Sequence, residues 1–338
     1  MSDVPWSAGT PVFRDATDAW GMTDLNVLGH QINVTDLEGD GLADLIVHTE
    51  GGHDDFAEDG ERVTWVLRNT GSRFEDVTES SNFRVRRDPA AGETWGRQGT
   101  IMASADVDND GDVDVYTAHW AWNDFEQTDW SETVLNDGTG HFELGPADGD
   151  HRREGENPTR PASVAFTDYD RDGYVDLWLV QNGFLNPYPD PDILFEGRGD
   201  GSFRDVTARR GIETLPWTNI GALNQAMGHT WGWAATACDL DNDGLPELMT
   251  ASYGRTPNQL WRPGRDDEGR VVFTNASVAS GYAYDDNGDW TDDVNARCYC
   301  ADNPSAADCD QAQPPPEPYP EVCEGIRAGF GGSYRWDH

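Results

Sequence analysis

Basic residues are scarce in this chain. Its 338 residues include 23 Lys and Arg against 63 Asp and Glu, which gives a formal net charge of −40 at pH 7. A surface of that sign repels phosphate backbones and anionic lipid head groups. The composition therefore argues against nucleic-acid binding and against docking to a membrane surface.

Long apolar runs are also missing. No stretch approaches the ~20 apolar residues that a spanning helix needs, so no membrane insertion is expected. Met1–Thr10 lacks the basic and apolar regions of a signal peptide. Hydrophobic residues make up only 36% of the chain, yet 14 Trp, 12 Phe and 10 Tyr supply enough bulk for a core. The length suits one large β-architecture or two modest domains.

Four acidic segments repeat along the chain. They begin at Asp36, Asp106, Asp168 and Asp239, which are 70, 62 and 71 residues apart, and read DLEGDGLADLIV, DVDNDGDVDVYT, DYDRDGYVDLWL and DLDNDGLPELMT. A second element, VFRDAT, RFEDVT, HFELGP, SFRDVT or VFTNAS, recurs around them. Short strands rich in Val, Ile, Trp, Tyr and Thr, bounded by Gly, Asp and Asn, indicate β structure. Each unit therefore predicts strand, acidic loop, strand, variable loop, strand, Gly/Asn turn and strand.

This periodicity predicts an all-β chain whose fold is a β-propeller of four-stranded blades. Blades of this kind bury one another's faces by stacking. Four blades are clear, and they could belong to a larger propeller. We divide the chain into blades over residues 1–281 and a tail over 282–338.

Carboxylates recur at positions 1, 3, 5 and 9 of each acidic loop. They are Asp36, Glu38, Asp40 and Asp44; Asp106, Asp108, Asp110 and Asp114; Asp168, Asp170, Asp172 and Asp176; and Asp239, Asp241, Asp243 and Glu247. Position 6 is always glycine, which permits a sharp turn. Position 7 should contribute a backbone carbonyl, from Leu42, Asp112, Tyr174 and Leu245.

Such crowded carboxylates predict bound calcium, about four ions in all. Calcium accepts six to eight oxygen ligands, and the carboxylates repel one another without a cation. An EF-hand would place a Glu at position 12 between helices, but position 12 is Val47, Thr117, Leu179 and Thr250, and a β run follows. A metal-free, solvated turn is the other alternative, and the fourfold recurrence argues against it. The first loop, with Glu38 and Gly39, is expected to bind least tightly.

The loop pattern carries a family resemblance. D-x-D-x-D-G-x-x-D-L, followed by N-G-x-F-x-D-V-T, resembles the FG-GAP (VCBS-type) repeats of integrin α-subunit propellers. The segment GHTWGWAATACDLDNDGLPELMTASYGRTPNQLW (Gly228–Trp261) resembles bacterial repeat proteins related to the cartilage acidic protein family. The resemblance covers roughly Val12–Gly281 and implies a propeller, usually of seven blades, with a calcium loop after each innermost strand. The Cys- and Gly-rich C-terminal module of that family is not visible here.

The ring has an unmatched element. Five copies of the outer-strand element accompany four acidic loops, and the extra copy is Pro11–Thr17. The chain could be part of a longer propeller, its tail could close a five-bladed ring, or a second chain could complete the ring. An exposed blade edge favours association, so further blades or a partner are expected.

The tail is rich in cysteine and proline and is predicted to be loop-like. Cys298, Cys300, Cys309 and Cys323 predict two disulfides, of which a Cys298–Cys300 pair is the least favoured by geometry. Disulfides agree with a secreted, periplasmic or cell-surface location. A zinc site is the alternative, but His338 is the one histidine nearby. Cys238 is interpreted as a small buried residue.

Histidines and loop aromatics supply the remaining candidates. His30, His119 and His229 could face a central channel and hold a metal or catalytic site, although ordinary packing roles are commoner. Trp120, Trp122, Trp130, Phe184, Tyr188 and Trp217 could stack on sugars or anchor a protein. Five further tryptophans are predicted to be core: Trp65, Trp178, Trp231, Trp233 and Trp261.

The leading hypothesis is a calcium-stabilised extracellular propeller that binds a protein or glycan, with no catalytic residues assigned. The alternative is a propeller enzyme, a lyase or hydrolase acting on polysaccharide, with its site at the channel mouth. A transition metal held by the three histidines would favour the enzyme. The blades alone do not decide between them, because one fold hosts many functions.

Overall fold

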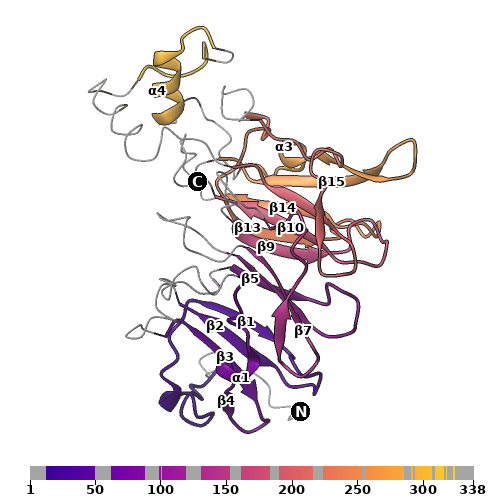
Figure 1. Cartoon of the computed structure of the whole chain (residues 1–338). Helices are drawn as coiled ribbons and strands as arrows, with labels where there is room; N and C mark the ends of the chain where they lie inside the picture. The colour runs from indigo at the N-terminus through magenta and orange to yellow at the C-terminus, as the bar shows by residue number, and fades with distance from the viewer. Residues whose placement is uncertain are drawn as a thin grey trace, which may run out of the picture.

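The computed structural model describes residues 13–49, 62–87, 99, 101–118, 131–152, 161–182, 190–215, 224–252, 256–284, 291, 294–306, 309–315, 317 and 323. These residues form four antiparallel sheets of four strands each, and every sheet is built from strands consecutive in sequence. Figure 1 shows the sheets following one another along the chain. The predicted all-β repeat architecture is therefore present.

The strand bounds follow the repeat. Sheet 1 contains β1 (Gln31–Thr35), β2 (Asp44–His48), β3 (Thr64–Asn69) and β4 (Phe74–Asp76). Sheet 2 contains β5 (Ile101–Ala105), β6 (Asp114–Ala118), β7 (Glu132–Asn136) and β8 (Phe142–Leu144). Sheet 3 contains β9 (Pro161–Thr167), β10 (Asp176–Gln181), β11 (Ile193–Gly197) and β12 (Phe203–Asp205). Sheet 4 contains β13 (Gly232–Cys238), β14 (Glu247–Ser252), β15 (Gln259–Arg265) and β16 (Val271–Asn275).

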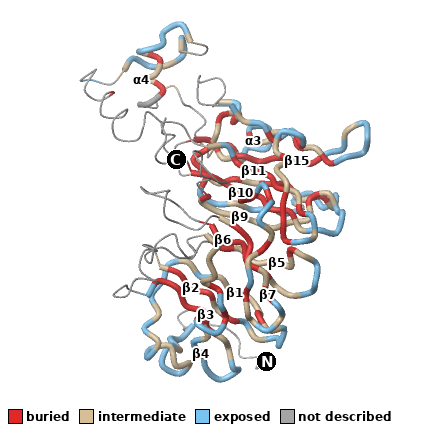
Figure 2. The backbone as a smooth tube through the Cα atoms, in the orientation of Figure 1, coloured by how far each residue is buried: buried red, intermediate tan, exposed pale blue. Residues whose placement is uncertain are grey.

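Neighbouring sheets pack face to face, and their first strands contact one another in the order β1, β5, β9 and β13. Side chains alternate across a strand, so each inner sheet can bury one row of apolar residues against either neighbour. Figure 2 shows these rows as buried segments inside the stack. The cluster between sheets 3 and 4 includes Tyr169, Trp178, Leu248, Trp261 and Phe273. Trp65, Trp178, Trp231 and Trp261 are buried, as predicted.

Segments outside the sheets hold some of the outer strands. The 3-10 helix η1 (Thr23–Leu25) precedes sheet 1, and the short helices α1 (Thr78–Ser81) and α3 (Ser277–Ser280) follow β4 and β16. The amide of Phe273 in β16 donates to the carbonyl of Arg210 at 2.7 Å, and that of Phe74 in β4 donates to Trp20 at 3.0 Å. In sheets 1 and 4, the segment that precedes the sheet is therefore hydrogen-bonded to the last strand of that sheet.

The N-terminal copy of the outer-strand element is not a strand. Pro11 and Val12 lie outside the described residues, and Phe13–Thr17 shows no strand pairing. The Phe13 side chain is 90% exposed, whereas Phe142, Phe203 and Phe273 are buried. Each of the four described sheets already has its own fourth strand, so this segment completes none of them. The described residues close no ring, and closure of a five-bladed ring by the tail, one of the three alternatives, is not observed among them.

Two residues of β13 correct the sequence prediction. Trp233 is 45% exposed, because the register shifts between Gly232 and Ala234 and leaves it out of the ladder. Cys238 is a free, exposed thiol. Ala235 and Ala237 pack toward sheet 3, so by alternation Cys238 points to the opposite face of sheet 4.

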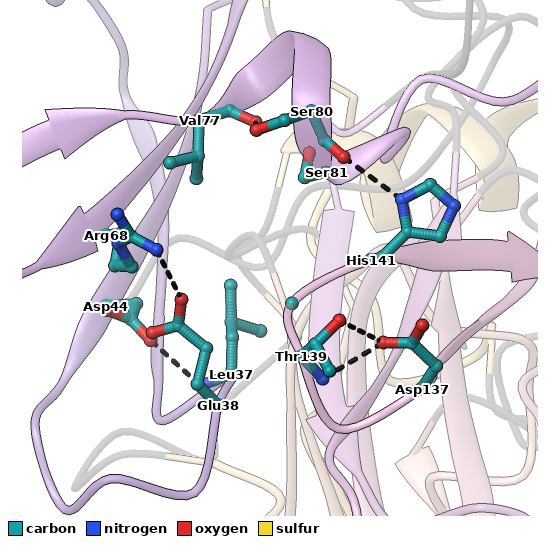
Figure 3. A pocket seen from close by; sticks show the side chains of 11 residues that line it. Leu37, Glu38, Asp44, Arg68, Val77, Ser80, Ser81, Asp137, Thr139 and His141 are labelled. Atoms are coloured by element: carbon teal, nitrogen blue, oxygen red, sulfur yellow. Dashed lines mark hydrogen bonds and ion pairs between the residues drawn. The ribbon is translucent and has the colours of Figure 1, made fainter.

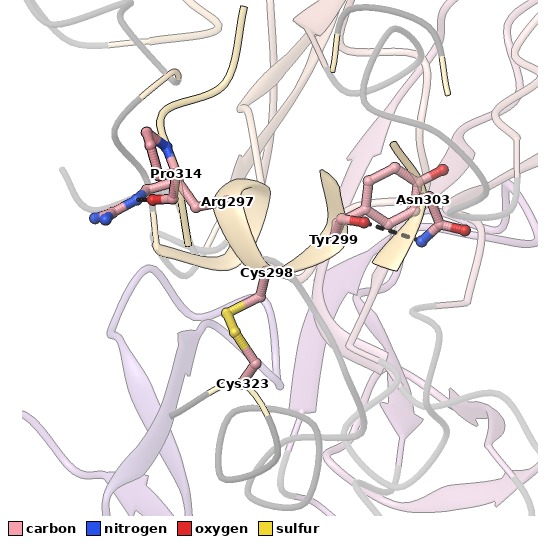
Figure 4. The surroundings of a disulfide bond; sticks show 6 residues. All are labelled: Arg297, Cys298, Tyr299, Asn303, Pro314 and Cys323. Atoms are coloured by element: carbon pink, nitrogen blue, oxygen red, sulfur yellow. Dashed lines mark hydrogen bonds between the residues drawn. A yellow bond between two sulfur atoms is a disulfide. The ribbon is translucent and has the colours of Figure 1, made fainter. Parts of the chain in front are cut away.

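The tail contains a helix where a loop was predicted. Helix α4 spans Val294–Asp302, and a disulfide joins Cys298 to Cys323 (Figure 4). A second disulfide joins Cys300 to Cys309. The prediction of two disulfides without a Cys298–Cys300 pair is confirmed. Figure 1 places α4 beyond sheet 4. Among the described helices, none has the length and apolarity to cross a bilayer.

Candidate metal centre

Each acidic loop joins the first strand of a sheet to the second. Position 1 directly follows the first strand, and position 9 is the first residue of the second strand: Asp44, Asp114, Asp176 and Glu247. Backbone groups freed at this turn must find partners. The loop carboxylates supply them, so the same side chains shape the loop and concentrate negative charge.

The position 1 carboxylate folds the loop back on itself. In loop 3, Asp168 accepts the amides of Asp172 and Gly173 at 3.1 Å each. In loop 4, Asp239 accepts the equivalent amides of Asp243 and Gly244 at 3.1 and 2.9 Å. The glycine at position 6 has a positive φ in all four loops, which L side chains rarely adopt.

The position 9 carboxylate ties the loop to the sheet. Asp114 accepts the amide of Val107 at 2.9 Å and that of Asn136, at the end of β7, at 2.8 Å. Asp176 repeats the arrangement with Tyr169 and Gly197, both at 2.9 Å. These oxygens keep lone pairs for a cation, because an ionised carboxylate has about four acceptor sites. Position 9 is therefore a structural anchor as well as a candidate ligand, a role that the sequence alone did not indicate.

Three of the four loops bring carboxylates together. Within the described residues, ligand atoms lie within 4.8 Å of one another in the groups Asp106, Asp108 and Asp114; Asp168, Asp170 and Asp176; and Asp239, Asp241 and Asp243. Asp106 Oδ1 and Asp170 Oδ1 are buried and have no hydrogen-bond partner. Buried, unpaired oxygens are costly. A hard cation would satisfy them, so the donor set fits calcium.

Burial changes the protonation equilibria of these groups. It raises the pKa of Asp114 to about 7 and that of Asp176 to about 8. Burial also raises the pKa of Asp108 and Asp170, with the neighbouring carboxylates of Asp110 and Asp172 as the next cause. A divalent cation at the cluster would oppose both effects, because it stabilises the ionised form.

The first loop is arranged differently. Loop 1 forms no cluster of the kind found in loops 2 to 4. Glu38 at position 3 pairs with Arg68 of β3 at 3.3 Å, but Asp170 at position 3 of loop 3 also pairs with an arginine, Arg210, at 3.3 Å, so the ion pair by itself does not distinguish loop 1. Arg68 is a residue that the sequence patterns did not single out. Glu38 also lines a cleft of about 360 Å³ between sheets 1 and 2, together with Asp44, Arg68 and His141 (Figure 3). Across this cleft His141 Nδ1 lies 3.0 Å from the Ser80 carbonyl.

The histidine and aromatic candidates do not assemble into a site in the described part of the chain. His229 is half-buried, its Nδ1 bonds to the Thr214 hydroxyl, and burial lowers its pKa to about 4. His30 lies near His48, whose pKa burial lowers to about 4. None of the three described clusters contains a histidine. His119 and the six candidate aromatic residues lie outside the described residues.

The fold and loops define a class: a repeat protein of four-stranded sheets with an acidic loop after each first strand. A family model described as an FG-GAP-like repeat matches residues 106–179, from loop 2 through most of β10. No curated protein matches the chain. The solved structures include the biofilm matrix protein Bap1 of V. cholerae, 15% identical, at a TM-score of 0.27, over 72% of this chain and 36% of that one. The chain thus spans about a third of Bap1, and a score so low carries no argument.

Proposed function

We propose that this chain is a calcium-stabilised, extracellular binding module built from FG-GAP-like blades of a β-propeller. The observation that carries the proposal is the convergence of carboxylates in three successive loops, with buried oxygens of Asp106 and Asp170 left without a hydrogen-bond partner. The repeat match over residues 106–179 supports the same reading. Calcium would be held by the acidic positions, with the carbonyls of Leu42, Asp112, Tyr174 and Leu245 as further ligands.

The role proposed for calcium is structural. Each loop is tied to its own sheet through position 9, so a cation in the loop would fix the turn between two strands. The packed side chains of neighbouring sheets would then hold the sheets against one another. Disulfides in the tail and the net charge of −40 agree with a secreted, periplasmic or cell-surface setting, where calcium is abundant.

Calorimetric titration with Ca²⁺ tests the metal proposal. We expect at least three sites, with no comparable heat from Mg²⁺, which prefers smaller octahedral sites and keeps its water. The single substitution Asp170→Asn should remove one site, because it replaces a buried carboxylate of loop 3 with a neutral amide. A chain that takes up no calcium at millimolar concentration would end the proposal.

The proposed ligand is a protein or a glycan, bound by the variable loops that carry the candidate aromatic residues. Screening the calcium-loaded chain on a glycan array and against extracellular matrix proteins tests this. Saturable binding without product formation supports a binding module. Turnover of a polysaccharide would support an enzyme instead, but no observation on the described residues favours one.

A further inference from the structure

Acidic loops of neighbouring sheets contact each other through position 4, which is not one of the proposed ligand positions. Asn109, at position 4 of loop 2, donates its side-chain N–H to the backbone carbonyl of Gly173 at 3.1 Å. Gly173 is position 6 of loop 3. The φ angles of the two residues are 61° and 92°, a conformation that Asn and Gly tolerate better than other residues. The bond therefore joins two turns that are each fixed in geometry.

The same pair of positions is in contact between loops 3 and 4. Arg171, at position 4 of loop 3, places its guanidinium directly against Gly244, at position 6 of loop 4. A Cβ on Gly244 would collide with that guanidinium. Position 4 of one loop thus reaches position 6 of the next in both junctions.

Loop 1 lacks the contact. Its position 4 is Gly39, which has a φ of 66° and no side chain, and a Cβ built there would find no atom within 4 Å. Loop 1 therefore lacks the contact between positions 4 and 6, although Asn136 connects it to loop 2 by another route, donating its side-chain N–H groups to the carbonyls of Leu37 at 2.8 Å and Val113 at 3.2 Å.

The hydrogen bond from Asn109 to Gly173 lies next to residues of loop 3 that are proposed to bind the cation. The Gly173 amide donates to Asp168, the position 1 carboxylate, and Gly173 precedes Tyr174, whose carbonyl is a proposed ligand. Ordering loop 2 fixes Asn109, and Asn109 then restrains the Gly173 carbonyl. A site that is ordered in advance pays less conformational entropy when its ion binds.

We propose that Asn109 couples cation binding in loop 2 to cation binding in loop 3, with positive cooperativity. This inference rests on the proposed calcium function. Asn109 is a positioning residue: it holds the Gly173 carbonyl, one peptide before the proposed Tyr174 ligand, and touches no ion. Coupling between two binding sites is reciprocal, so it can be measured from either loop.

Terbium luminescence provides a readout for loop 3. Tb³⁺ substitutes for Ca²⁺, and the emission excited through Tyr174, which is the part lost in Tyr174→Phe, reports occupancy of loop 3. Loop 2 is disabled by combining Asp106→Asn with Asp108→Asn. We expect this change to weaken Tb³⁺ binding in loop 3 about threefold to tenfold, the worth of one hydrogen bond.

Asn109→Gly should abolish that dependence. It removes the side chain but keeps a residue suited to positive φ, as in loop 1. In this background, disabling loop 2 should change loop 3 affinity less than about twofold. Asn242→Gly is the matched control: Asn242 is position 4 of loop 4 at φ 58°, and no acidic loop follows it in the described part of the chain. This control should leave loop 3 affinity and its dependence on loop 2 as they are in the unmodified protein.

Two results separate the failures. If neither Ca²⁺ nor Tb³⁺ binds the unmodified chain, the proposed function and the coupling fall together. If both bind, but disabling loop 2 weakens loop 3 equally with and without the Asn109 side chain, the coupling is wrong and the calcium function stands. Circular dichroism of each variant checks that the sheets are intact.

Discussion

At the scale of single residues, buried carboxylates outside the acidic loops are informative. Asp192 precedes β11 and lies at the junction of sheets 3 and 4, where it accepts hydrogen bonds from the Gln181 amide at 2.9 Å and the Thr250 hydroxyl at 2.7 Å. Burial raises its pKa to about 7, against the hydrogen bonds that lower it. A carboxyl whose pKa is higher in the folded state stabilises the fold below its unfolded pKa and loses that contribution as pH rises.

Asp192→Asn should therefore change the pH dependence of stability. Below about pH 4 the Asp192 side chain is neutral in both states, so protein and variant should differ little. Between about pH 4 and pH 7 the unmodified protein should lose stability relative to the variant, by about 1.4 kcal/mol per pH unit, because the unfolded chain ionises Asp192 while the folded state keeps it protonated. Urea unfolding of both proteins across this range, in excess calcium, measures the difference. A constant difference from pH 4 to pH 8 would contradict the prediction.

At the scale of secondary-structure elements, most of the strand arrangement could be predicted from the sequence. Strand alternation and the recurring acidic turns predicted four strands per unit, and position 9 marks the start of each second strand, as at Asp44 and Asp114. The structure differs from the prediction where the outcome depends on how strands pair, which a sequence pattern does not specify. The bulge that exposes Trp233 and the failure of Phe13–Thr17 to pair both depend on which strands are available nearby. The Glu38–Arg68 ion pair, which involves a candidate ligand of loop 1, joins two residues that are 30 positions apart in the sequence.

The junction between sheets 3 and 4 should depend on Trp178 of β10. Its side chain is fully buried, and its indole N–H donates to the Met249 carbonyl in β14 at 3.1 Å. Trp178→Ala should lower the free energy of unfolding by about 3–5 kcal/mol, through lost burial and a cavity. Trp178→Phe keeps most of the apolar contact and should cost less. Chemical denaturation followed by circular dichroism measures both variants.

The half-exposed Trp233 provides the comparison for that prediction. Trp233→Ala removes the same side chain from the neighbouring strand β13, at a point where the ladder is interrupted. It should cost less than the Trp178 variant by at least about 2 kcal/mol, because less buried area is lost. Equal losses for the two variants would mean that β10 does not anchor the junction.

At the scale of the whole molecule, charge and stability are connected through the loops. The chain carries a formal charge of −40, and sixteen of its carboxylates occupy positions 1, 3, 5 and 9 of the four acidic loops. In each loop the position 9 carboxylate also accepts the amide of position 2, which ties the loop to its second strand. Ions bound only by the folded state stabilise it by about 2.7 kcal/mol per site when their concentration is a hundred times the dissociation constant. Three such sites would add about 8 kcal/mol in total.

Chelation should therefore lower the melting temperature by more than about ten degrees, given about 2–4 °C per kcal/mol for chains somewhat shorter than this one. Differential scanning calorimetry with and without EDTA measures the shift, and excess calcium should reverse it. A variant with Asp108, Asp170 and Asp241 changed to Asn should melt lower than the unmodified protein in calcium and respond little to EDTA, because its loops no longer hold the ion. An unmodified chain that melts at the same temperature in chelator would show that the acidic loops fold without a metal, and the structural role proposed for calcium would be wrong.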